Sequence, residues 1–343
     1  MRKRVVLLLL LVGFLFVSCE ENMRSLADKN GLLFGVAVRS SDLFDPVASK
    51  LIEDNFNIVV TENIMKLENL RPNPRFWNWN PVDDFVEAAT EKGMKLRGHT
   101  FIWHNQLPAF ARNIRTREEG IKVIEDTITQ VLTRYKGKFY EYDVCNEIID
   151  DETGGLRKTV WLDTIGPDYA DIAFRIAKET DPSVKLILND YSNEYAGTIK
   201  GDGFYNFVKG MVERGVPIDG VGFQLHLSTD YPLNEQALRK NIHRFYDLGL
   251  TVSFTEIDVR VKMPMTPQKE KLQKEIYEKL LRIALEEKVS CFVMWGYTDA
   301  NSWVPGTFPG YGSAHPFDRQ LKPKELYISM GKILAEYAEK NKK

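Results

Sequence analysis

The chain has 343 residues, of which 43% are hydrophobic and 27% are charged. These proportions suit a water-soluble protein with a sizeable core and do not indicate disorder. Lysine and arginine number 46 against 48 acidic residues. This even balance argues against nucleic acid as the main partner, because nucleic-acid binding normally needs a basic face.

The first 19 residues are typical of a signal peptide. A basic segment, residues 1–4, precedes an apolar run, residues 5–17, which is shorter than the about 20 residues of a membrane-spanning helix. Ser18 and Cys19 follow and resemble a bacterial lipoprotein processing site, which predicts lipidation of Cys19. Ordinary cleavage nearby, with Cys19 removed or free, is the alternative. We therefore expect an exported protein, either a lipoprotein anchored at the cell surface or in the periplasm or a secreted protein, with no other membrane contact.

The remainder, residues 25–343, is predicted to form one domain, because no repeat, low-complexity tract or linker interrupts this part of the sequence. Its two cysteines, Cys145 and Cys291, lie in separate apolar runs. Two isolated cysteines make neither a disulfide framework nor a metal cluster. We expect both to be buried free thiols.

Eight short apolar runs that end in polar residues recur along this domain, and such runs are typical of buried strands. They span residues 33–38, 58–63, 96–101, 141–146, 185–190, 220–226, 252–258 and 291–296. Helical patterns lie between them, at residues 121–135, 169–180, 237–248 and 271–287. Eight strand–helix units predict an α/β fold, a closed (β/α)8 TIM barrel. A doubly wound open sheet is the alternative, but no glycine-rich phosphate turn follows the first run.

Polar residues gather at the carboxyl ends of these runs. In a barrel this end is the active-site face, because the loops that follow the strands converge there. Random placement would instead scatter polar groups along strands whose interior positions reject unpaired polar groups. The residues concerned are Glu62, His99, Asn146, Asp190, His226, Glu256 and Trp295.

Two glutamates are the strongest catalytic candidates. Glu147 follows the fourth run and Glu256 lies near the end of the seventh, and strands four and seven of a barrel face each other across its mouth. Glycoside hydrolysis needs such a pair of carboxyl groups, one proton donor and one nucleophile or base. A separation of about 5 to 5.5 Å predicts retention of configuration, and a wider gap predicts inversion. A lone glutamate would more often form a salt bridge or a helix cap, but the pair favours catalysis.

Seven ordered segments together resemble the family 10 glycoside hydrolases, the endo-xylanase family, over nearly the whole mature chain. Residues 142–147 (YDVCNE) look like the acid/base motif of that family, and residues 255–258 (TEID) look like its nucleophile motif. The other matching segments are residues 61–66 (TENIMK), 97–108 (RGHTFIWHNQLP), 189–191 (NDY), 218–226 (IDGVGFQLH) and 295–303 (WGYTDANSW).

The resemblance implies roles for individual residues. Glu147 would be the acid/base and Glu256 the nucleophile. Substrate-binding roles on the donor side would fall to Glu62, Asn63 and Lys66, and those around the cleaved bond to His99, Trp103 and Asn146. Gln224 and His226 would lie beside the nucleophile, Trp295 and Trp303 would form aromatic walls, and Tyr191 would lie on the acceptor side. We also expect His226 to orient Glu256, with Asp258 orienting His226 in turn.

Two features that could suggest other functional sites are interpreted differently. His99 and His104 form a His-x4-His pair, but no third ligand stands at a suitable spacing, so we expect no metal site and no cofactor. Trp77 and Trp79 are interpreted as packing residues. The chain departs from the family pattern at Tyr142, Cys145, Leu67, Asn105 and Val304, which puts the affinity of individual subsites in doubt but removes no catalytic group.

The resemblance thus implies an endo-1,4-β-xylanase that hydrolyses internal bonds of xylan or xylo-oligosaccharides with retention, by double displacement. We expect it to act as a monomer. The nearest alternative is a β-1,4-glucanase or cellulase of the same mechanism. A non-catalytic surface glycan-binding lipoprotein is another alternative, although it predicts loss of a carboxylate that this chain retains. A transport-associated solute-binding protein would show two lobes rather than eight strand–helix units.

Overall fold

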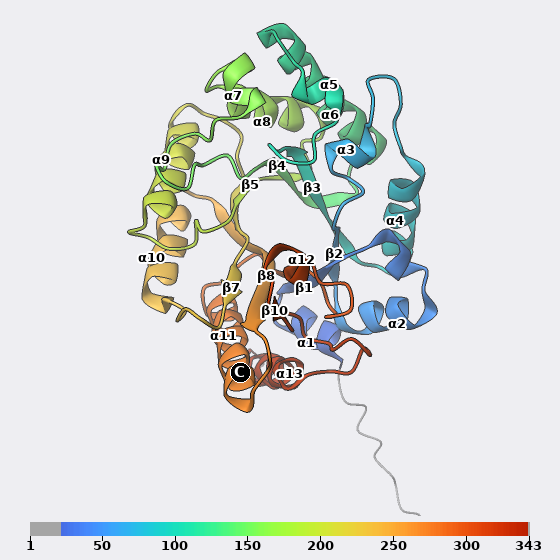
Figure 1. The fold of residues 1–343 in the computed structure, drawn as a ribbon, viewed down its shortest axis with the longest axis vertical. Coiled ribbons are helices and arrows are strands. Elements are labelled where there is room, and N and C mark those ends of the chain that lie inside the picture. The colour runs from blue at the N-terminus through green and yellow to red at the C-terminus, as the bar shows by residue number, and fades with distance from the viewer. Residues whose placement is uncertain (1–21, 342–343) are drawn as a thin grey trace, which may run out of the picture.

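A computed structural model describes residues 22–341, so the predicted signal peptide and Cys19 lie outside the described residues. Within this part of the chain, parallel strands form a closed barrel, because β8 pairs with β9 and β9 pairs with β1 (Figure 1). The barrel strands are β1 (Leu33–Val38), β2 (Ile58–Thr61), β3 (Lys95–Ile102), β4 (Phe139–Asn146), β5 (Lys185–Asp190), β6 (Gly220–Phe223), β8 (Thr251–Lys262) and β9 (Cys291–Met294). The predicted (β/α)8 TIM barrel is confirmed.

One long helix follows each barrel strand and packs outside the barrel (Figure 1). These helices are α2 (Pro46–Asn55), α4 (Asn80–Glu91), α6 (Arg117–Arg134), α8 (Tyr169–Thr180), α9 (Ile199–Glu213), α10 (Glu235–Tyr246), α11 (Pro267–Glu286) and α13 (Glu325–Lys340). Shorter helices are α1 (Met23–Lys29), η1 (Ser40–Leu43), α3 (Leu67–Leu70), α5 (Ala109–Arg112), α7 (Val160–Ile165) and α12 (Val304–Thr307). Among residues 22–341, none of these helices has the length and apolar composition needed to cross a membrane.

Helix starts follow capping residues rather than the apolar stripes used to predict them. Helix α6 begins at Arg117, before the predicted residue 121, because Thr116 accepts a hydrogen bond from the Glu119 amide and Glu119 accepts one from the Thr116 amide. This reciprocal pair is a capping box. Thr266 similarly caps α11, which begins at Pro267 instead of residue 271. Helix α8 has the predicted bounds, residues 169–180.

The predicted strand 220–226 is wrong as a single element. It breaks after Phe223, where Leu225 adopts a left-handed backbone conformation with φ 61°, and continues as β7 (His226–Ser228). Strand β7 pairs in parallel with the distal half of β8, which is longer than predicted and also pairs with β10 (Tyr311–Gly312). This pairing places His226 directly opposite Asp258. The break therefore brings the two residues together at the barrel mouth.

The barrel interior beneath the mouth contains a fully buried ion cluster. Arg97 of β3 donates from Nε to Glu141 Oε1 at 2.7 Å and from Nη1 to Asp143 Oδ2 at 2.6 Å, and its Nη2 also bonds Asp143. Ser253 Oγ donates to the second oxygen of Glu141 at 3.0 Å. All the charged side chains of this cluster have no solvent exposure, so each must be satisfied by its neighbours.

Replacing Arg97 with methionine is expected to lower the free energy of unfolding by about 3–5 kcal/mol, because it leaves two carboxylates buried without their cation. Urea denaturation followed by circular dichroism measures this loss. The control is Arg282→Met, which breaks an ion pair with Glu336 whose side chains are 41% and 43% exposed; it is expected to cost about 0–1 kcal/mol. Equal losses in the two variants would contradict the prediction.

The two predicted free thiols are confirmed, because Cys145 and Cys291 are both buried and unpaired in β4 and β9. Trp77 and Trp79 stack on each other with ring centroids 4.8 Å apart and pack against the core. The structure thus supports packing roles for both tryptophans. Tyr142, a departure from the family pattern, stacks on Phe101 at 3.8 Å and fits because Gly98 has no side chain, as a Cβ there would lie 2.1 Å from the tyrosine ring.

Candidate active site

A cavity of about 590 Å³ opens at the carboxyl ends of the strands and contains most of the predicted site residues. The predicted residues that line it are Lys66, His99, Trp103, Asn146, Glu147, Tyr191, Gln224, His226, Glu256, Trp295 and Trp303. They come from segments that are far apart in the sequence and converge because every barrel strand ends at this face.

Glu256 projects from β8 and is surrounded by hydrogen-bond donors. Asn189 Nδ2 donates to Glu256 Oε1 at 2.7 Å, and His226 Nε2 lies 3.4 Å from Oε2. The residue is only 4% exposed. Burial alone would raise the pKa of Glu256, but the His226 hydrogen bond and the nearby positive charges outweigh burial and lower the pKa to about 2. Glu256 is therefore ionised over the whole ordinary pH range.

His226 links Glu256 to Asp258, as predicted from the sequence. Its Nδ1 lies 2.9 Å from Asp258 Oδ2, while the indole Nε1 of Trp303 donates to the same oxygen at 2.7 Å. Burial would lower the pKa of His226, but the charge and hydrogen bond of Asp258 and the contact with Glu256 raise it to about 10. A histidine cation between two carboxylates thus fixes the orientation of Glu256.

The imidazole of His226 is expected to remain protonated at pH 7 and to lose its proton near pH 10. NMR titration of its ring resonances, assigned with a His226→Gln variant, measures this directly. Because the folded-state pKa is raised, the stabilisation is complete below the ordinary pKa of 6.5 and is lost as the pH rises towards about 10. The wild-type free energy of unfolding, relative to the variant, should therefore decline over that range. A neutral His226 at pH 7 would refute this prediction.

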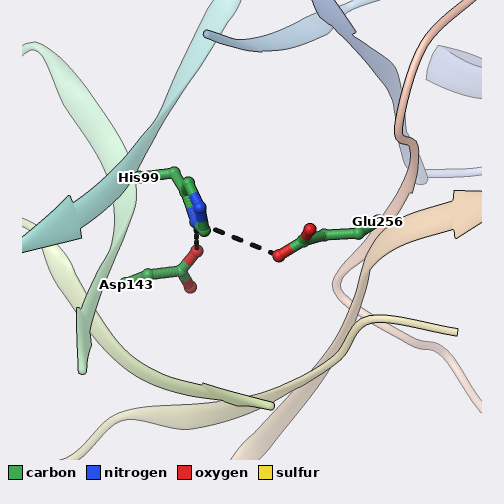
Figure 2. Close-up of side chains that lie close together, drawn as sticks. All are labelled: His99, Asp143 and Glu256. Carbon is green, nitrogen blue, oxygen red and sulfur yellow. Dashed lines mark hydrogen bonds and ion pairs between the residues drawn. The ribbon is translucent and has the colours of Figure 1, made fainter. Parts of the chain in front are cut away.

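A second histidine, His99, approaches the other side of Glu256 (Figure 2). Its Nδ1 lies 2.8 Å from Asp143 Oδ2 and 3.9 Å from Glu256 Oε1. Ligand atoms of these three residues lie within 4.8 Å of one another, a spacing that a metal ion could use. Both oxygens of Asp143 already accept from Arg97, however, so a protein cation neutralises the cluster. The contacts are explained by this ion pair, and the absence of a metal stays a prediction.

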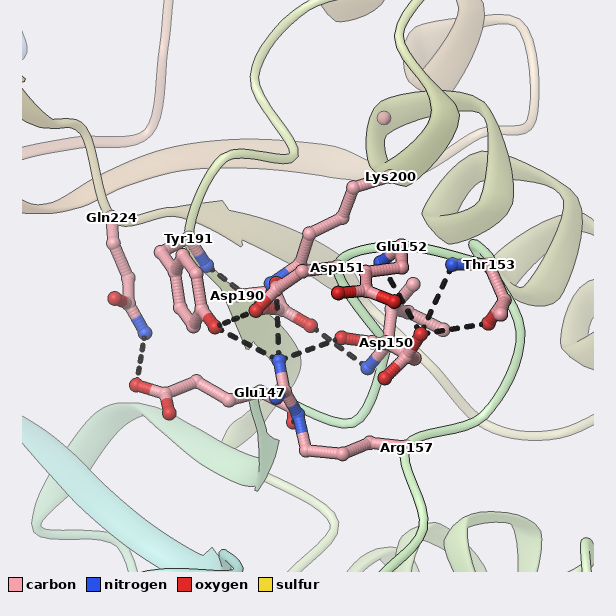
Figure 3. Close-up of polar contacts among 12 residues, drawn as sticks. Glu147, Asp150, Asp151, Glu152, Thr153, Arg157, Asp190, Tyr191, Lys200 and Gln224 are labelled. Carbon is pink, nitrogen blue, oxygen red and sulfur yellow. Dashed lines mark hydrogen bonds and ion pairs between the residues drawn. The ribbon is translucent and has the colours of Figure 1, made fainter.

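Glu147 stands where β4 ends and has a different environment from Glu256. Its backbone is left-handed, with φ 57°, and its amide donates to the Asn189 carbonyl at 2.9 Å. Two neutral donors contact its carboxyl group. Trp103 Nε1 donates to Oε2 at 2.7 Å. Gln224 Nε2 donates to Oε1 at 3.2 Å (Figure 3). The cavity thus holds one carboxylate paired with a cation and one carboxyl group held by neutral side chains.

The amide of Asn146 is oriented by its neighbours. Its Oδ1 accepts from Asn189 Nδ2 at 2.9 Å and from Gln224 Nε2 at 3.1 Å. With the oxygen engaged twice, the amide nitrogen is the group left to donate into the cavity. This orientation agrees with the predicted contact between Asn146 and a sugar hydroxyl.

Lys66 brings a cation to the aromatic side of the cavity. Its Nζ lies 4.9 Å from the ring centroid of Trp103 and 5.8 Å from that of Trp295, and it donates to Asn63 Oδ1 at 3.1 Å. Burial lowers the pKa of Lys66, while the charges of Glu256 and Glu147 oppose that effect. A desolvated cation between tryptophan rings is a strong donor for sugar hydroxyls.

Three predicted residues lie beside the cavity rather than in its wall. Asp258 lies behind His226 and contacts its Nδ1. Asn63 is exposed and reaches the cavity through its bond to Lys66, and Gln106 Nε2 donates to it at 3.4 Å. Burial raises the pKa of Glu62 to about 7, with a contribution from the charge of Asp42, so its protonation changes near neutral pH.

Sequence reasoning missed several residues of the site. Asn189 bridges Asn146 and Glu256, and the side chain of His104 comes within 4.0 Å of Glu147. Asn189 and His104 lie within the segments 189–191 and 97–108, which match the family. Their positions in these segments were the sequence signal that could have identified them. Other unpredicted lining residues are Asn105, Ser192, Glu194, Arg260 and Phe308.

Comparisons with known proteins indicate one family for this chain. Residues 22–332 match the family described as Glycosyl hydrolase family 10. The chain is 37% identical over 339 residues to "Endo-1,4-beta-xylanase B" of Thermotoga neapolitana. The matched region covers 96% of this chain and 97% of that protein. The chain is also 37% identical over 280 residues to "Endo-1,4-beta-xylanase A" of Fusarium oxysporum f. sp. lycopersici, over 79% of this chain and 85% of that protein.

Solved structures agree with these sequence matches. Xylanase 10B from Thermotoga petrophila, solved in complex with xylobiose, superposes with a TM-score of 0.88 and 38% identity over 92% of this chain and 98% of that one. Native xylanase 10B from Thermotoga maritima superposes with a TM-score of 0.89 and 39% identity, over 93% of this chain and 99% of that one.

Proposed function

The chain belongs to glycosyl hydrolase family 10, and on this premise we propose that it is an endo-1,4-β-xylanase that cleaves internal β-1,4 bonds of xylan with retention of configuration. The observation that carries the proposal is the pair of carboxyl groups in one cavity with different hydrogen-bond partners. Glu256 is held ionised beside the His226 cation, whereas Glu147 contacts the neutral donors Trp103 and Gln224. Double displacement needs this asymmetry between nucleophile and proton donor.

In the first step, a carboxylate oxygen of Glu256 attacks the anomeric carbon of the donor sugar and forms a covalent ester. The bond from that carbon to the glycosidic oxygen breaks, and the leaving oxygen takes the proton from Glu147. The Asn146 amide donates to the 2-hydroxyl of the same sugar, a contact that strengthens in the transition state. Lys66 and His99 bind other hydroxyls of this sugar, while Trp295 and Trp303 present apolar ring faces to its C–H surface.

In the second step, water replaces the departed acceptor chain. Glu147, now ionised, removes a proton from the water as its oxygen attacks the anomeric carbon. The ester bond to Glu256 breaks, and the carboxylate returns to its ion pair with His226. Two inversions at one carbon give net retention, and each residue returns to its starting protonation state.

Donor-side binding by Glu62, Asn63 and Lys66 and acceptor-side binding by Tyr191 place the cleaved bond inside a longer chain of sugars. Such a cleft suits internal cleavage of a polymer. The proposed substrate is therefore xylan or a xylo-oligosaccharide, and the proposed acting species is a monomer, which light scattering during gel filtration would test.

The function is tested by comparing purified β-1,4-xylan with a β-1,4-glucan. The proposal expects a ladder of short xylo-oligosaccharides that appears early in digestion, and a kcat/KM on xylan far above that on glucan. The reverse preference would keep the mechanism but overturn the substrate. Binding of both polymers without cleavage would overturn the proposal that the protein is an enzyme.

We also propose that the mature protein is exported and carries a lipid on Cys19. The support is the basic start, the apolar run and the Ser18–Cys19 sequence at residues 1–19. Expression in a bacterial host followed by detergent phase partitioning tests the anchor, with Cys19→Ser as the comparison. The wild type should enter the detergent phase and the variant the aqueous phase; recovery of both in the aqueous phase would contradict lipidation.

A further inference from the structure

Four charged residues behind the Glu147 loop form a connected unit that the two catalytic steps do not use. We define Asp151, Arg157, Asp190 and Lys200 as the loop clamp. We propose that the loop clamp positions Glu147 and Tyr191 relative to each other, so that the proton donor meets the oxygen of a leaving sugar that rests on Tyr191. This inference rests on the proposed role of Glu147 as acid/base and adds positioning residues to it.

The first part of the unit is the attachment of Arg157 to the backbone around Glu147. Its Nε donates to the Glu147 carbonyl at 2.9 Å and its Nη2 to the Ile149 carbonyl at 2.9 Å (Figure 3). The Arg157 amide also donates to the Ile148 carbonyl at 2.7 Å. Glu147 itself has a left-handed backbone, φ 57°, which is unfavourable for a residue with a side chain. The guanidinium therefore fixes a backbone segment that has an intrinsic tendency to relax.

The second part is a buried ion pair under the same loop. Asp190 has no solvent exposure; its Oδ2 accepts from the Ile149 amide at 3.1 Å, and its Oδ1 pairs with Lys200 Nζ at 2.8 Å. Lys200 Nζ also donates to Asp151 Oδ1 at 2.6 Å. The loop after Glu147 is thus held from both sides, by Arg157 and by Asp190, and Lys200 joins it to helix α9.

The third part is the way in which the unit holds Tyr191. The tyrosine hydroxyl donates to Asp151 Oδ2 at 2.6 Å and accepts from Arg157 Nη2 at 2.9 Å. Lys200 Nζ lies 3.3 Å from the ring centroid, so it covers one face of the ring. The Tyr191 hydroxyl thus has two hydrogen-bond partners, and Lys200 covers one face of the ring. The other ring face is available to the cavity that Tyr191 lines. Both Tyr191 and Glu147 are therefore bonded to the same guanidinium.

The loop clamp contains two acidic and two basic side chains, and burial raises the pKa of Asp190 to about 7, so around neutral pH the net charge of the unit is at most one positive charge. Its effect on Glu147 is consequently expected to be mainly geometric rather than a field from a net charge. Misplacing a proton donor by about 1 Å can cost about 100-fold in rate. Such a loss should appear only in reactions whose leaving group needs the proton.

Leaving-group dependence tests the proposal in the full-length enzyme with Arg157→Met. The substrates are phenyl β-xylobioside, whose leaving group needs protonation, and 2,4-dinitrophenyl β-xylobioside, whose leaving group departs as a stable anion. We expect kcat/KM on the phenyl substrate to fall about 10- to 100-fold, while kcat/KM on the dinitrophenyl substrate stays within about twofold of wild type. Partial unfolding lowers both values by one factor, so their ratio reports positioning alone.

The matched control is Arg24→Met. Arg24 is also partly buried and also donates to backbone carbonyls, those of Lys92 at 3.1 Å and Gly93 at 2.9 Å, but it does so where β3 begins, at the opposite end of the barrel. For Arg24→Met, the ratio of kcat/KM on the phenyl substrate to kcat/KM on the dinitrophenyl substrate should equal that of wild type. An unchanged ratio in Arg157→Met would overturn the proposal that the loop clamp positions Glu147. A Glu147→Ala variant measured alongside separates the two claims, because an unchanged ratio there would instead overturn the acid/base assignment.

A second variant, Lys200→Met, tests the link to Tyr191. It should lower the rate of transfer from the glycosyl-enzyme to added xylobiose as acceptor, relative to hydrolysis by water, by about 10-fold. The Lys240→Met variant removes an exposed lysine of α10 and should leave this ratio unchanged. An unchanged ratio in Lys200→Met would show that Tyr191 is positioned without the loop clamp.

Discussion

Replacing Glu256 with alanine is expected to reduce kcat on xylan by at least about 10⁴-fold, on the scale of losses seen when an enzyme nucleophile is removed. Glu147 is not expected to take over this role, because Trp103 and Gln224 hold its carboxyl group in another part of the cavity. Removing the side chain also leaves a space beside Asn189 and the His226 cation, where a small anion can bind. Initial rates of reducing-sugar release measure the loss.

Added azide provides the sharper readout for this variant. Azide can attack the anomeric carbon from the face that Glu256 occupied, so the expected product is an α-xylosyl azide, identified by NMR. Glu213→Ala, which removes a 65% exposed side chain of α9, is the control and should keep wild-type activity. Substantial remaining activity of Glu256→Ala, or a β-azide product, would contradict the nucleophile assignment.

Replacing Glu147 with alanine is expected to produce a loss that depends on the leaving group. On xylan, kcat/KM should fall by about 10² to 10⁴-fold, the usual contribution of general acid catalysis. On 2,4-dinitrophenyl β-xylobioside, kcat/KM should stay near the wild-type value, because the dinitrophenolate leaves without a proton. Steady-state kinetics on the two substrates measures the difference.

The second step should also slow in this variant, because water loses its general base. Azide needs no base and should raise kcat on the dinitrophenyl substrate, with β-xylobiosyl azide as product. The opposite configurations of the two azides, α for Glu256→Ala and β for Glu147→Ala, distinguish the two roles within one experiment. An equal loss on both substrates would contradict the acid/base role.

The fold could be predicted to a large extent because barrel strands are buried on both sides. Their apolar runs predict β1 and β5 at their observed bounds. Helix starts were less accurate, because the cap at Thr116 lies outside the apolar stripe of α6. The break at Leu225 could not be predicted, since its left-handed conformation occurs in a residue with no turn tendency and is stabilised by pairing of β7 with β8.

The site was predictable where polar residues end a strand and matched a motif. Glu147, Glu256 and His226 were predicted in this way, and the structure brings them into one cavity. Residues that act through others give no such signal. Arg97 lies inside an apolar strand, and Arg157 and Lys200 lie in a loop and a helix, so only the folded chain reveals their partners. Their side chains matter because of long-range contacts, which a local pattern does not encode.

Trapping the covalent intermediate tests directly whether Glu256 is the nucleophile. 2,4-Dinitrophenyl 2-deoxy-2-fluoro-β-xylobioside should glycosylate the nucleophile and release dinitrophenolate, because its leaving group permits the first step while the fluorine slows the second. Mass spectrometry of the intact protein and of its proteolytic peptides then locates the label. We expect one fluoroxylobiosyl group per molecule, attached to Glu256, and slow recovery of activity when xylobiose is added as acceptor. A label on another residue, or inactivation without any covalent label, would contradict double displacement through Glu256.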